Sequence, residues 1–143
     1  MAANQIDVEH LFTLTALIGD STHAVIRNGP TGTRMIAPVS GGSFEGPGIK
    51  GSIVAPAGDW VHARKNRTIH LDVRLQLATD DGESILMTYQ GIGKPNEDGT
   101  TSIRSAPTFE TGSEKYAWLN DVQAVGIGTA GVESVTYEVY GLK

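Results

Sequence analysis

The chain contains no cysteine. This absence excludes disulfide bridges, thiolate catalysis and cysteine-based zinc sites. Long apolar runs are also missing, because none approaches the roughly 20 residues that a membrane helix needs. Residues 1–10, MAANQIDVEH, lack the basic and apolar regions of a secretory signal. We therefore expect a cytoplasmic protein with no membrane contact.

Positive charge is scarce. Lys and Arg number 11 against 16 Asp and Glu, which gives a formal net charge of −5. Nucleic-acid binding needs clustered Lys and Arg, and the short cluster at residues 64–67 is typical of a solvated turn, so we expect no nucleic-acid partner. The hydrophobic fraction of 39% and the length of 143 residues predict one globular domain over residues 1–143.

Helical periodicity is nearly absent, and the dominant period is two. In TIHLDVRLQLAT (68–79), aliphatic and polar residues alternate, as in a half-buried strand. The turn signal Asp81-Gly82 follows, so residues 68–93 are predicted to form one β-hairpin. Further strands are predicted at 10–19, 33–39, 48–56, 59–64, 102–112, 121–131 and 133–142, with a small turn around Ala57-Gly58 between the third and fourth of these.

The fold class follows from this pattern. Only residues 114–121 are predicted to form a short helix, with Ser113 as its cap. About eight to ten short strands with regular turns predict an all-β fold. We expect a small antiparallel β-barrel, with a β-sandwich as the alternative.

Two motifs are excluded by their context. Gly126–Gly131 matches G-x-G-x-x-G, but a strand-like segment follows where a dinucleotide site needs a helix, so we interpret it as a glycine-rich hairpin turn. His70 and Asp72 have the spacing of two iron ligands, but no histidine follows them in the chain. We therefore expect no metal site.

The polar face of residues 68–79 has two interpretations. In the first, the aliphatic row Ile69 to Leu77 fills the barrel and the polar row meets water. In the second, the polar row lines a lumen, and the aliphatic row packs against another subunit. Charged residues within or beside other apolar strands favour the second, because isolated buried charge is costly. These residues are Arg34, Arg104 and Glu110.

The aromatic residues also have two interpretations. Trp60, Phe109, Tyr116 and Trp118 either pack in the core or form the wall of an apolar pocket. Phe44 is a further candidate for the pocket wall. It lies in GGSFEGPGIKG (41–51), whose glycines we expect to provide the sharp bends of a small barrel. We expect Gly51 to leave room for a side chain such as Trp60.

Several short motifs, taken in order, resemble the DUF3237 family, also called UPF0311. They are GGSFEGP (41–47), GDW (58–60), LDVR (71–74), TDDG (79–82), TY-x-G (88–91), AP-x-FETG (106–112) and YAWLN (116–120). The resemblance covers about residues 9–140 and implies a lipocalin-like barrel. The family pattern includes polar residues matching Asp72, Arg74, Tyr89, Arg104 and Glu110, which implies a shared site or a buried ion-pair network and favours the inward orientation.

We therefore expect a cofactor-independent enzyme of the lyase, isomerase, cyclase or hydratase type, acting on a small apolar oxygenated metabolite. Asp72 or Glu110 would be the acid or base, with His70 as a second candidate base. Arg74 or Arg104 would bind a carboxylate or oxyanion, and Tyr89 would donate a proton or hydrogen bond. Alternatives are a non-catalytic ligand-binding barrel and a structural protein with a buried ion-pair network.

The inward orientation also implies an oligomer. An exposed aliphatic row from Ile69 to Leu77 is too large an apolar patch for a monomer. A symmetric homodimer, or a higher homo-oligomer, is the arrangement that such a patch predicts.

Overall fold

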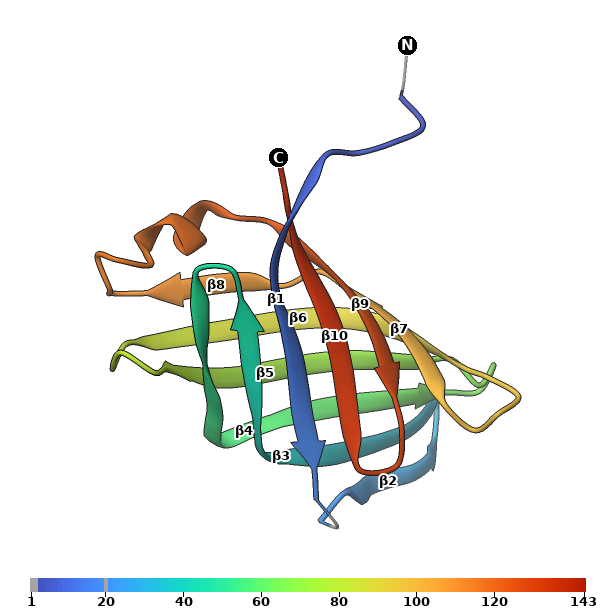
Figure 1. The fold of residues 1–143 in the computed structure, drawn as a ribbon. Helices are drawn as coiled ribbons and strands as arrows, with labels where there is room; N and C mark the ends of the chain where they lie inside the picture. The colour runs from blue at the N-terminus through green and yellow to red at the C-terminus, as the bar shows by residue number, and fades with distance from the viewer. Residues whose placement is uncertain (1–2, 20) are drawn as a thin grey trace.

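The computed structural model describes residues 3–19 and 21–143, and it is almost entirely β-structure (Figure 1). The strands are β1 (Val8–Ile18), β2 (His23–Gly29), β3 (Gly32–Gly46), β4 (Ile49–Arg64), β5 (Ile69–Thr79), β6 (Ser84–Pro95), β7 (Thr101–Ser105), β8 (Thr108–Thr111), β9 (Ala124–Ala130) and β10 (Ser134–Leu142). One short 3₁₀ helix, η1 (Ala117–Asp121), interrupts them. No helix in the described part of the chain has the length and apolar character needed to span a membrane.

The strands close into an eight-stranded antiparallel barrel, as the sequence predicts. The hydrogen-bonded order is β1-β10-β9-β7-β6-β5-β4-β3, and β3 returns to pair with β1. β2 extends the sheet beyond β3, and β8 pairs with β6. In Figure 1, β1, β9 and β10 run steeply across the front of β3 to β6. The two groups of strands therefore face each other across the interior.

Some strand boundaries differ from prediction. β4 is one strand, with an irregular register between Val54 and Gly58 in place of the expected turn. The segment around Pro107 forms two short strands, as a proline without an amide hydrogen favours. β2 is missing from the prediction because it lacks the alternating burial that marks a strand: five of its seven residues are exposed, and only Ala24 and Gly29 are half-buried.

The glycines of residues 41–51 allow close backbone approach. A β-carbon at Gly46 would overlap the Leu11 carbonyl of β1, and one at Gly42 would overlap that of Thr15. Gly42 also has a φ of +145°, which L residues rarely adopt. The close approach of β1 and β3 therefore agrees with the expected role of these glycines in the curvature of the barrel. Gly51, however, makes room for the Ala78 carbonyl and not for Trp60.

The interior is filled by the aliphatic row of β5. Leu71, Val73, Leu75 and Leu77 are buried, whereas the intervening polar side chains of β5 lie on the outer face. The predicted inward orientation of the polar row is therefore wrong. The aliphatic row fills the interior because its apolar burial stabilises the fold, and burial of unpaired charges would oppose it. The exposed aliphatic row that implied an oligomer does not exist.

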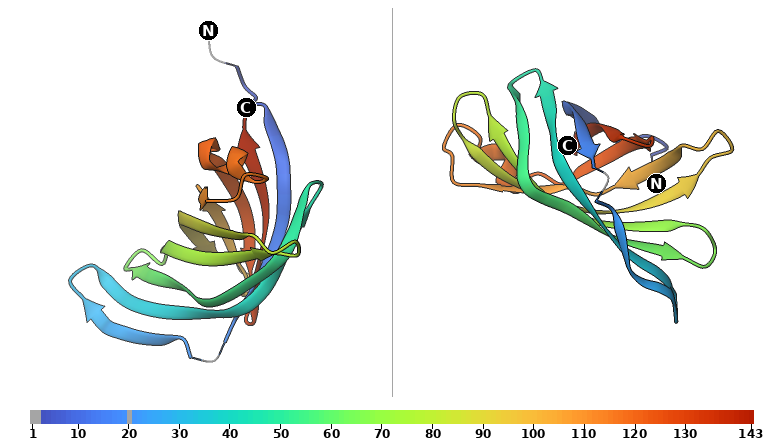
Figure 2. Two further views of the ribbon diagram at one scale, coloured as in Figure 1. Left: turned by 90° about the vertical axis from the view of Figure 1, so that its left-hand side faces the viewer. Right: turned by 90° about the horizontal axis from the view of Figure 1, so that it is seen from below.

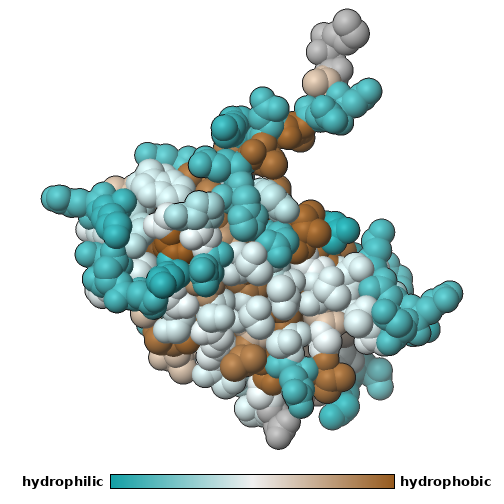
Figure 3. Space-filling view, viewed as in Figure 1, coloured by the Kyte–Doolittle hydropathy of each residue, from teal (hydrophilic) through white to brown (hydrophobic). Residues whose placement is uncertain are grey.

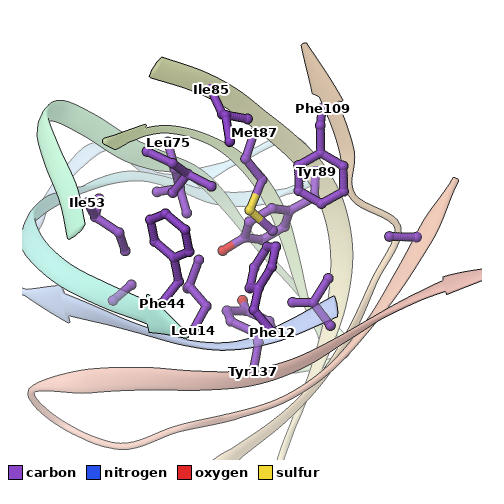
Figure 4. Close-up of a cluster of buried hydrophobic side chains, with 14 of the residues drawn as sticks. Phe12, Leu14, Phe44, Ile53, Leu75, Ile85, Met87, Tyr89, Phe109 and Tyr137 are labelled. Carbon is purple, nitrogen blue, oxygen red and sulfur yellow. The ribbon is translucent and has the colours of Figure 1, made fainter. Parts of the chain in front are cut away.

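An aromatic cluster forms the centre of this core (Figure 4). The ring of Phe12 lies 5.5 Å from that of Phe44 and 5.9 Å from that of Phe109. The three rings come from β1, β3 and β8, so side chains distant in sequence join the walls of the barrel. Aromatic pairs at such distances add to the stabilisation from area burial.

The segment containing η1 covers one end of the barrel. Tyr116 and Leu119 are buried in the core, and the Tyr116 hydroxyl donates to Asp81 at 2.9 Å. Lys115 Nζ lies 2.6 Å from the same carboxylate, so the β5–β6 turn holds this segment in place. The predicted helix is only this 3₁₀ turn. Ser113 is not its cap, because η1 has no side-chain cap and the buried Ser113 hydroxyl has no partner among the described residues.

Candidate functional site

Asp59 is an acidic residue on the inner wall of the barrel. It lies on β4 opposite Ala37 of β3 and Val73 of β5, both of which are buried. Because strand side chains alternate, Asp59 shares the inward face of β4 with Val61, while Trp60 points outward. An acid in this position is surrounded mainly by apolar side chains.

The surroundings of Asp59 favour its protonated form. Burial raises the pKa of Asp59 from 3.8 to about 6, and the nearby Asp72 carboxylate raises it slightly further. The backbone N–H of Asp72 donates to Asp59 Oδ1 at 2.9 Å and partly offsets this increase. Among the described residues, no hydrogen bond reaches Oδ2. This oxygen is therefore free to hold or release a proton near neutral pH.

Two buried phenols lie beside this carboxyl. The rings of Tyr89 on β6 and Tyr137 on β10 are 5.3 Å apart in an edge-to-face arrangement. Figure 4 shows their hydroxyl oxygens directed to the same part of the interior. Burial raises the pKa of both phenols, and the charge of Asp59 raises each further. Both phenols therefore remain neutral hydrogen-bond donors at physiological pH.

The glycines of β9 create the space for Tyr137. A β-carbon at Gly128 would lie 2.6 Å from Cδ1 of the Tyr137 ring. Gly126 lies under the same ring and beside Ser105. These residues belong to the G-x-G-x-x-G sequence, which lies mostly within strand β9 and ends at the β9–β10 turn. Its first two glycines therefore seat an aromatic ring, in addition to the predicted role of the motif in a hairpin.

Asp59, Tyr89 and Tyr137 line a cavity of about 30 Å³. Its other walls are aliphatic, contributed by Ala16, Ile18, Ala37, Val39, Leu71, Val73 and Val135. This volume holds about one or two water molecules, or one reacting group of a larger ligand. The cavity combines a protonatable carboxyl and two phenols with dry walls, which is the composition of an acid–base site.

The inner surface continues from the cavity toward a splayed end of the barrel. Figure 2 shows β2 and the adjoining part of β3 diverging from β1 and β10. Met35 and Ala63 lie next to Val61 on the inner face and are only half-buried, as is Ile69. This end therefore presents an apolar, partly accessible surface beside the cavity.

Several predicted site residues meet on the opposite side of the wall. Arg34, Trp60, His70, Asp72 and Arg104 line an open groove of about 610 Å³ on the outer face, which we call the outer groove. Arg74 lies next to it, with its guanidinium 5.7 Å from the centre of the Trp60 ring. The sequence thus grouped these residues correctly but placed them on the wrong face. Their catalytic and ligand-binding roles stay predictions.

The other predicted site residues are dispersed. Tyr89 points inward and lines the cavity. Phe44, Phe109 and Tyr116 are packed in the core, whereas Trp118 on η1 is 46% exposed. Glu110 on β8 is exposed beside a separate shallow groove. The fold does not bring these residues together at one site.

Sequence reasoning overlooked Asp59 and Tyr137. Asp59 lies two residues before the apolar Val61, so the two side chains share one face of the strand. This pattern indicates that Asp59 points inward. The expected turn at Ala57-Gly58 obscured that phase, because β4 was divided there. Tyr137 shares one strand face with Val135 and Val139, so the sequence pattern predicts that it is buried. Its contact with Tyr89 depends on closure of the barrel and could not be predicted locally.

Figure 3 shows the outer surface over β1, β9 and β10. Hydrophilic colour is concentrated at its margins, and the centre is mostly neutral, in keeping with outward residues such as Thr13, Thr129 and Thr136. Within residues 3–19 and 21–143, no three His, Asp or Glu side chains are grouped so that they could hold a metal ion.

Comparison with known proteins places this architecture in a family. Residues 6–142 match the family described as "Protein of unknown function (DUF3237)". A UPF0311 protein of Rhodopseudomonas palustris is 31% identical over 148 aligned residues, covering 94% of this chain and 95% of that protein. A β-barrel-like crystal structure from Acinetobacter baumannii has a TM-score of 0.90 and 28% identity, with 99% of both chains covered.

A more partial match is a hydroalkoxylation enzyme of Penicillium herquei. It is 32% identical over 94 aligned residues, which cover 65% of this chain and 56% of that protein. The full-length matches agree with the motifs read from the sequence. The chain therefore belongs to the DUF3237 family, also named UPF0311.

Proposed function

We propose that the protein is a cofactor-independent acid–base enzyme acting on a small, mostly apolar, oxygenated metabolite. The observation that carries this proposal is Asp59, a carboxyl with a pKa of about 6 in an aliphatic cavity beside two phenols. A general acid or base is most effective when its pKa lies near the working pH. Burial of such a group is costly to folding, and catalysis accounts for its presence.

Each residue of the cavity has a distinct part in this proposal. Asp59 Oδ2 donates or accepts the proton, while its Oδ1 is held by the Asp72 N–H. Tyr89 and Tyr137 hydrogen-bond a substrate oxygen and stabilise charge that develops on it. The apolar walls exclude water from the proton transfer. Because the cavity has only about 30 Å³, the substrate's body lies along the splayed end, against Met35 and Ile69.

The Penicillium herquei relative supports one reaction type in particular. Hydroalkoxylation is the addition of an O–H group across a C=C bond. Within one molecule it is an isomerisation: the protonated carboxyl gives its proton to one alkene carbon, and the substrate oxygen bonds to the other carbon. The hydroxyl proton then returns to the carboxylate. Atoms and electrons balance without a cofactor, so Asp59 alone can supply and recover the proton.

The test uses an ortho-prenylphenol, whose hydroxyl can add across its own C=C bond to close a ring. Conversion by the wild type, Asp59→Asn and Asp72→Asn is followed by chromatography and mass spectrometry. Asp72→Asn is the matched control, because it changes a neighbouring carboxylate on the outer face and keeps the backbone N–H. We expect Asp59→Asn to lower kcat by at least about 100-fold, and Asp72→Asn to retain activity within a few-fold.

The pH dependence adds a second readout. If protonated Asp59 is the acid, wild-type conversion falls as the pH rises through about 6, the pKa of this carboxyl. Loss of conversion in Asp72→Asn but not in Asp59→Asn would move the chemistry to the outer face. Tight binding with no product in any variant would replace the enzyme with a non-catalytic binding barrel.

A further inference from the structure

The outer groove carries a row of side chains across five strands, β3 to β7, and four of the five are basic. Arg34 pairs with His62, His62 with His70, His70 with Ile92, and Ile92 with Arg104. Register partners lie side by side on the same face of a sheet, about 4.8 Å apart. The row therefore spans about 19 Å of the outer face and has an arginine at each end, with an aliphatic side chain between His70 and Arg104.

The two arginines lack the acidic partners that arginines usually have. Among the described residues, neither Arg34 nor Arg104 has a carboxylate within ion-pair distance. The Arg104 guanidinium donates only to the backbone carbonyl of Ile103, at 2.9 Å. The chain as a whole carries a net charge of −5, so this positive row runs against its overall charge. Asp72 also lines the outer groove, but among the described residues it forms no ion pair with either arginine, so the two arginines are suited to an external anion.

Of the two histidines, His62 is hydrogen-bonded through Nε2 to Thr31, whereas His70 has no such partner within the part of the chain that the structure describes. The Nε2 atom of His70 is buried and has no hydrogen-bond partner among the described residues. Desolvation lowers the pKa of His70, and the charges of Arg64, His62 and Arg34 lower it further. The positive field at this imidazole is therefore not neutralised by the protein. An anion in the groove would neutralise the field and provide an acceptor.

The rest of the groove is suited to an apolar body. Trp60 is 48% exposed and Ile92 is 45% exposed, although both are large hydrophobic residues. The groove volume of about 610 Å³ is within the range of small-molecule sites. Trp60 offers a flat face, and Arg74 already stacks on it at 5.7 Å.

We propose that the outer groove binds a small organic anion with a carboxylate or phosphate head and a flat apolar body. The head group lies along the row, where the positive field of both arginines acts on it, and the body lies over Ile92 and Trp60. This site is separate from the cavity that contains Asp59, because the two lie on opposite faces of β4 and β5. It gives the barrel a second ligand surface.

The test measures binding by isothermal titration calorimetry at low salt. The probes are 1-naphthoate, 1-naphthyl phosphate and the neutral 1-naphthamide, which share one ring system. We expect at least one anion to bind, and the amide to bind at least tenfold more weakly. A preference between the two anions identifies the head group. Affinity for the anion also decreases as salt concentration rises.

Variants locate the site. Arg34→Gln and Arg104→Gln each weaken anion binding by at least about tenfold, whereas Arg27→Gln on exposed β2 leaves it within about twofold. Asp59→Asn retains binding. The proposal is overturned if neither anion binds at millimolar concentration, if the amide binds equally, or if Asp59→Asn alone abolishes binding. A dimer that dissociates in Arg34→Gln and binds no probe would make the groove a subunit interface and also overturn it.

Discussion

Two aspartates show that the two faces of the barrel wall provide different environments for the same type of side chain. Asp59 on β4 lies inside, in an aliphatic environment that raises its pKa to about 6. Asp72 on the neighbouring strand β5 lies outside in the open groove, and its backbone N–H donates to Asp59 Oδ1 at 2.9 Å. The backbone N–H of Asp72 thus positions the carboxyl of Asp59. Position relative to the wall, and not residue type, therefore sets the difference between the environments of the two carboxyls.

The same contrast runs through the neighbouring residues. The inner face is apolar and closely packed. The polar residues at its cavity are Asp59, Tyr89 and Tyr137. The outer face bears the more conspicuous charges, including Arg34 and Arg104. Several charges on one strand are therefore a poor guide to which ionisable side chains are buried. A single acid that shares a strand face with aliphatic residues is a better guide.

The largest expected difference between the faces is in packing. Leu75 is fully buried on β5, and Arg74 beside it is exposed. Leu75→Ala should cost about 2–5 kcal/mol of the free energy of unfolding, because it removes core contacts and leaves a cavity. Arg74→Ala should cost less than about 1 kcal/mol, the usual size of an exposed cation–π contact. Urea unfolding measures both, and equal costs would contradict the assigned strand orientation.

The next prediction concerns the folding cost of Asp59. Raising its pKa from 3.8 to about 6 corresponds to roughly 3 kcal/mol of destabilisation when the carboxyl is ionised. The folded state holds this proton more tightly than the unfolded state, so stability decreases as the pH rises from about 4 to 6 and the full cost applies above 6. Asp59→Asn removes the charge and should therefore be more stable than the wild type at pH 8.

Thermal unfolding of Asp59→Asn and the wild type between pH 4 and 8 checks this prediction. The two melting temperatures should converge near pH 4 and differ by several degrees at pH 8. Asp72→Asn is the control and should show a much smaller divergence, because the Asp72 charge raises the pKa of Asp59 only slightly. A lower stability of Asp59→Asn at pH 8 would indicate that the ionised carboxylate is paired within the fold.

A smaller difference is expected between neighbouring residues of β9. Gly128→Ala would press a methyl group onto the Tyr137 ring and should cost about 1–3 kcal/mol, a typical penalty for overpacking. Ile127→Ala, on the outer face, should change stability by less, within about 1 kcal/mol. Chemical denaturation compares the two variants. Unchanged stability of Gly128→Ala would contradict the seating of Tyr137 on this glycine.

The smallest effect is expected at the rim. Asp81 accepts hydrogen bonds from Lys115, Thr79 and Tyr116, and these lower its pKa. A lowered pKa gives stability that is present above about pH 4 and is lost as the pH falls below it. Asp81→Asn should therefore lower the melting temperature slightly at pH 7, and the difference should shrink at pH 3. Asp80→Asn serves as the control, and the same loss in both variants would exclude a specific role for Asp81.

The sequence predicted the fold better than the site. Strict alternation in residues 68–79, the Asp-Gly turn and the glycines of residues 41–51 are local signals, and they indicated a barrel with sharp curvature. The orientation of the polar row was misread because isolated charges were assumed to be buried. The arginines in fact lie at the outer surface, where water solvates them at little cost.

The cavity could not be assembled from local patterns. Asp59, Tyr89 and Tyr137 come from three strands, and β10 faces β4 and β6 only after β1 pairs with β3. The irregular register of β4 between Val54 and Gly58 keeps the phase of the strand, because Ile53 before it and Asp59 after it both pair with inward residues of β5, Leu77 and Val73. Such sites depend on closure of the whole sheet, so their members share no motif.

The most direct test of the central claim is the titration of Asp59 itself. Carboxyl ¹³C chemical shifts, assigned by comparison with the spectrum of Asp59→Asn, report the protonation of this side chain as a function of pH. We expect the Asp59 resonance to titrate with a midpoint near 6. A midpoint near 4, the ordinary value for an exposed aspartate, would show that Asp59 is solvated and would contradict its assignment as the buried acid of the barrel.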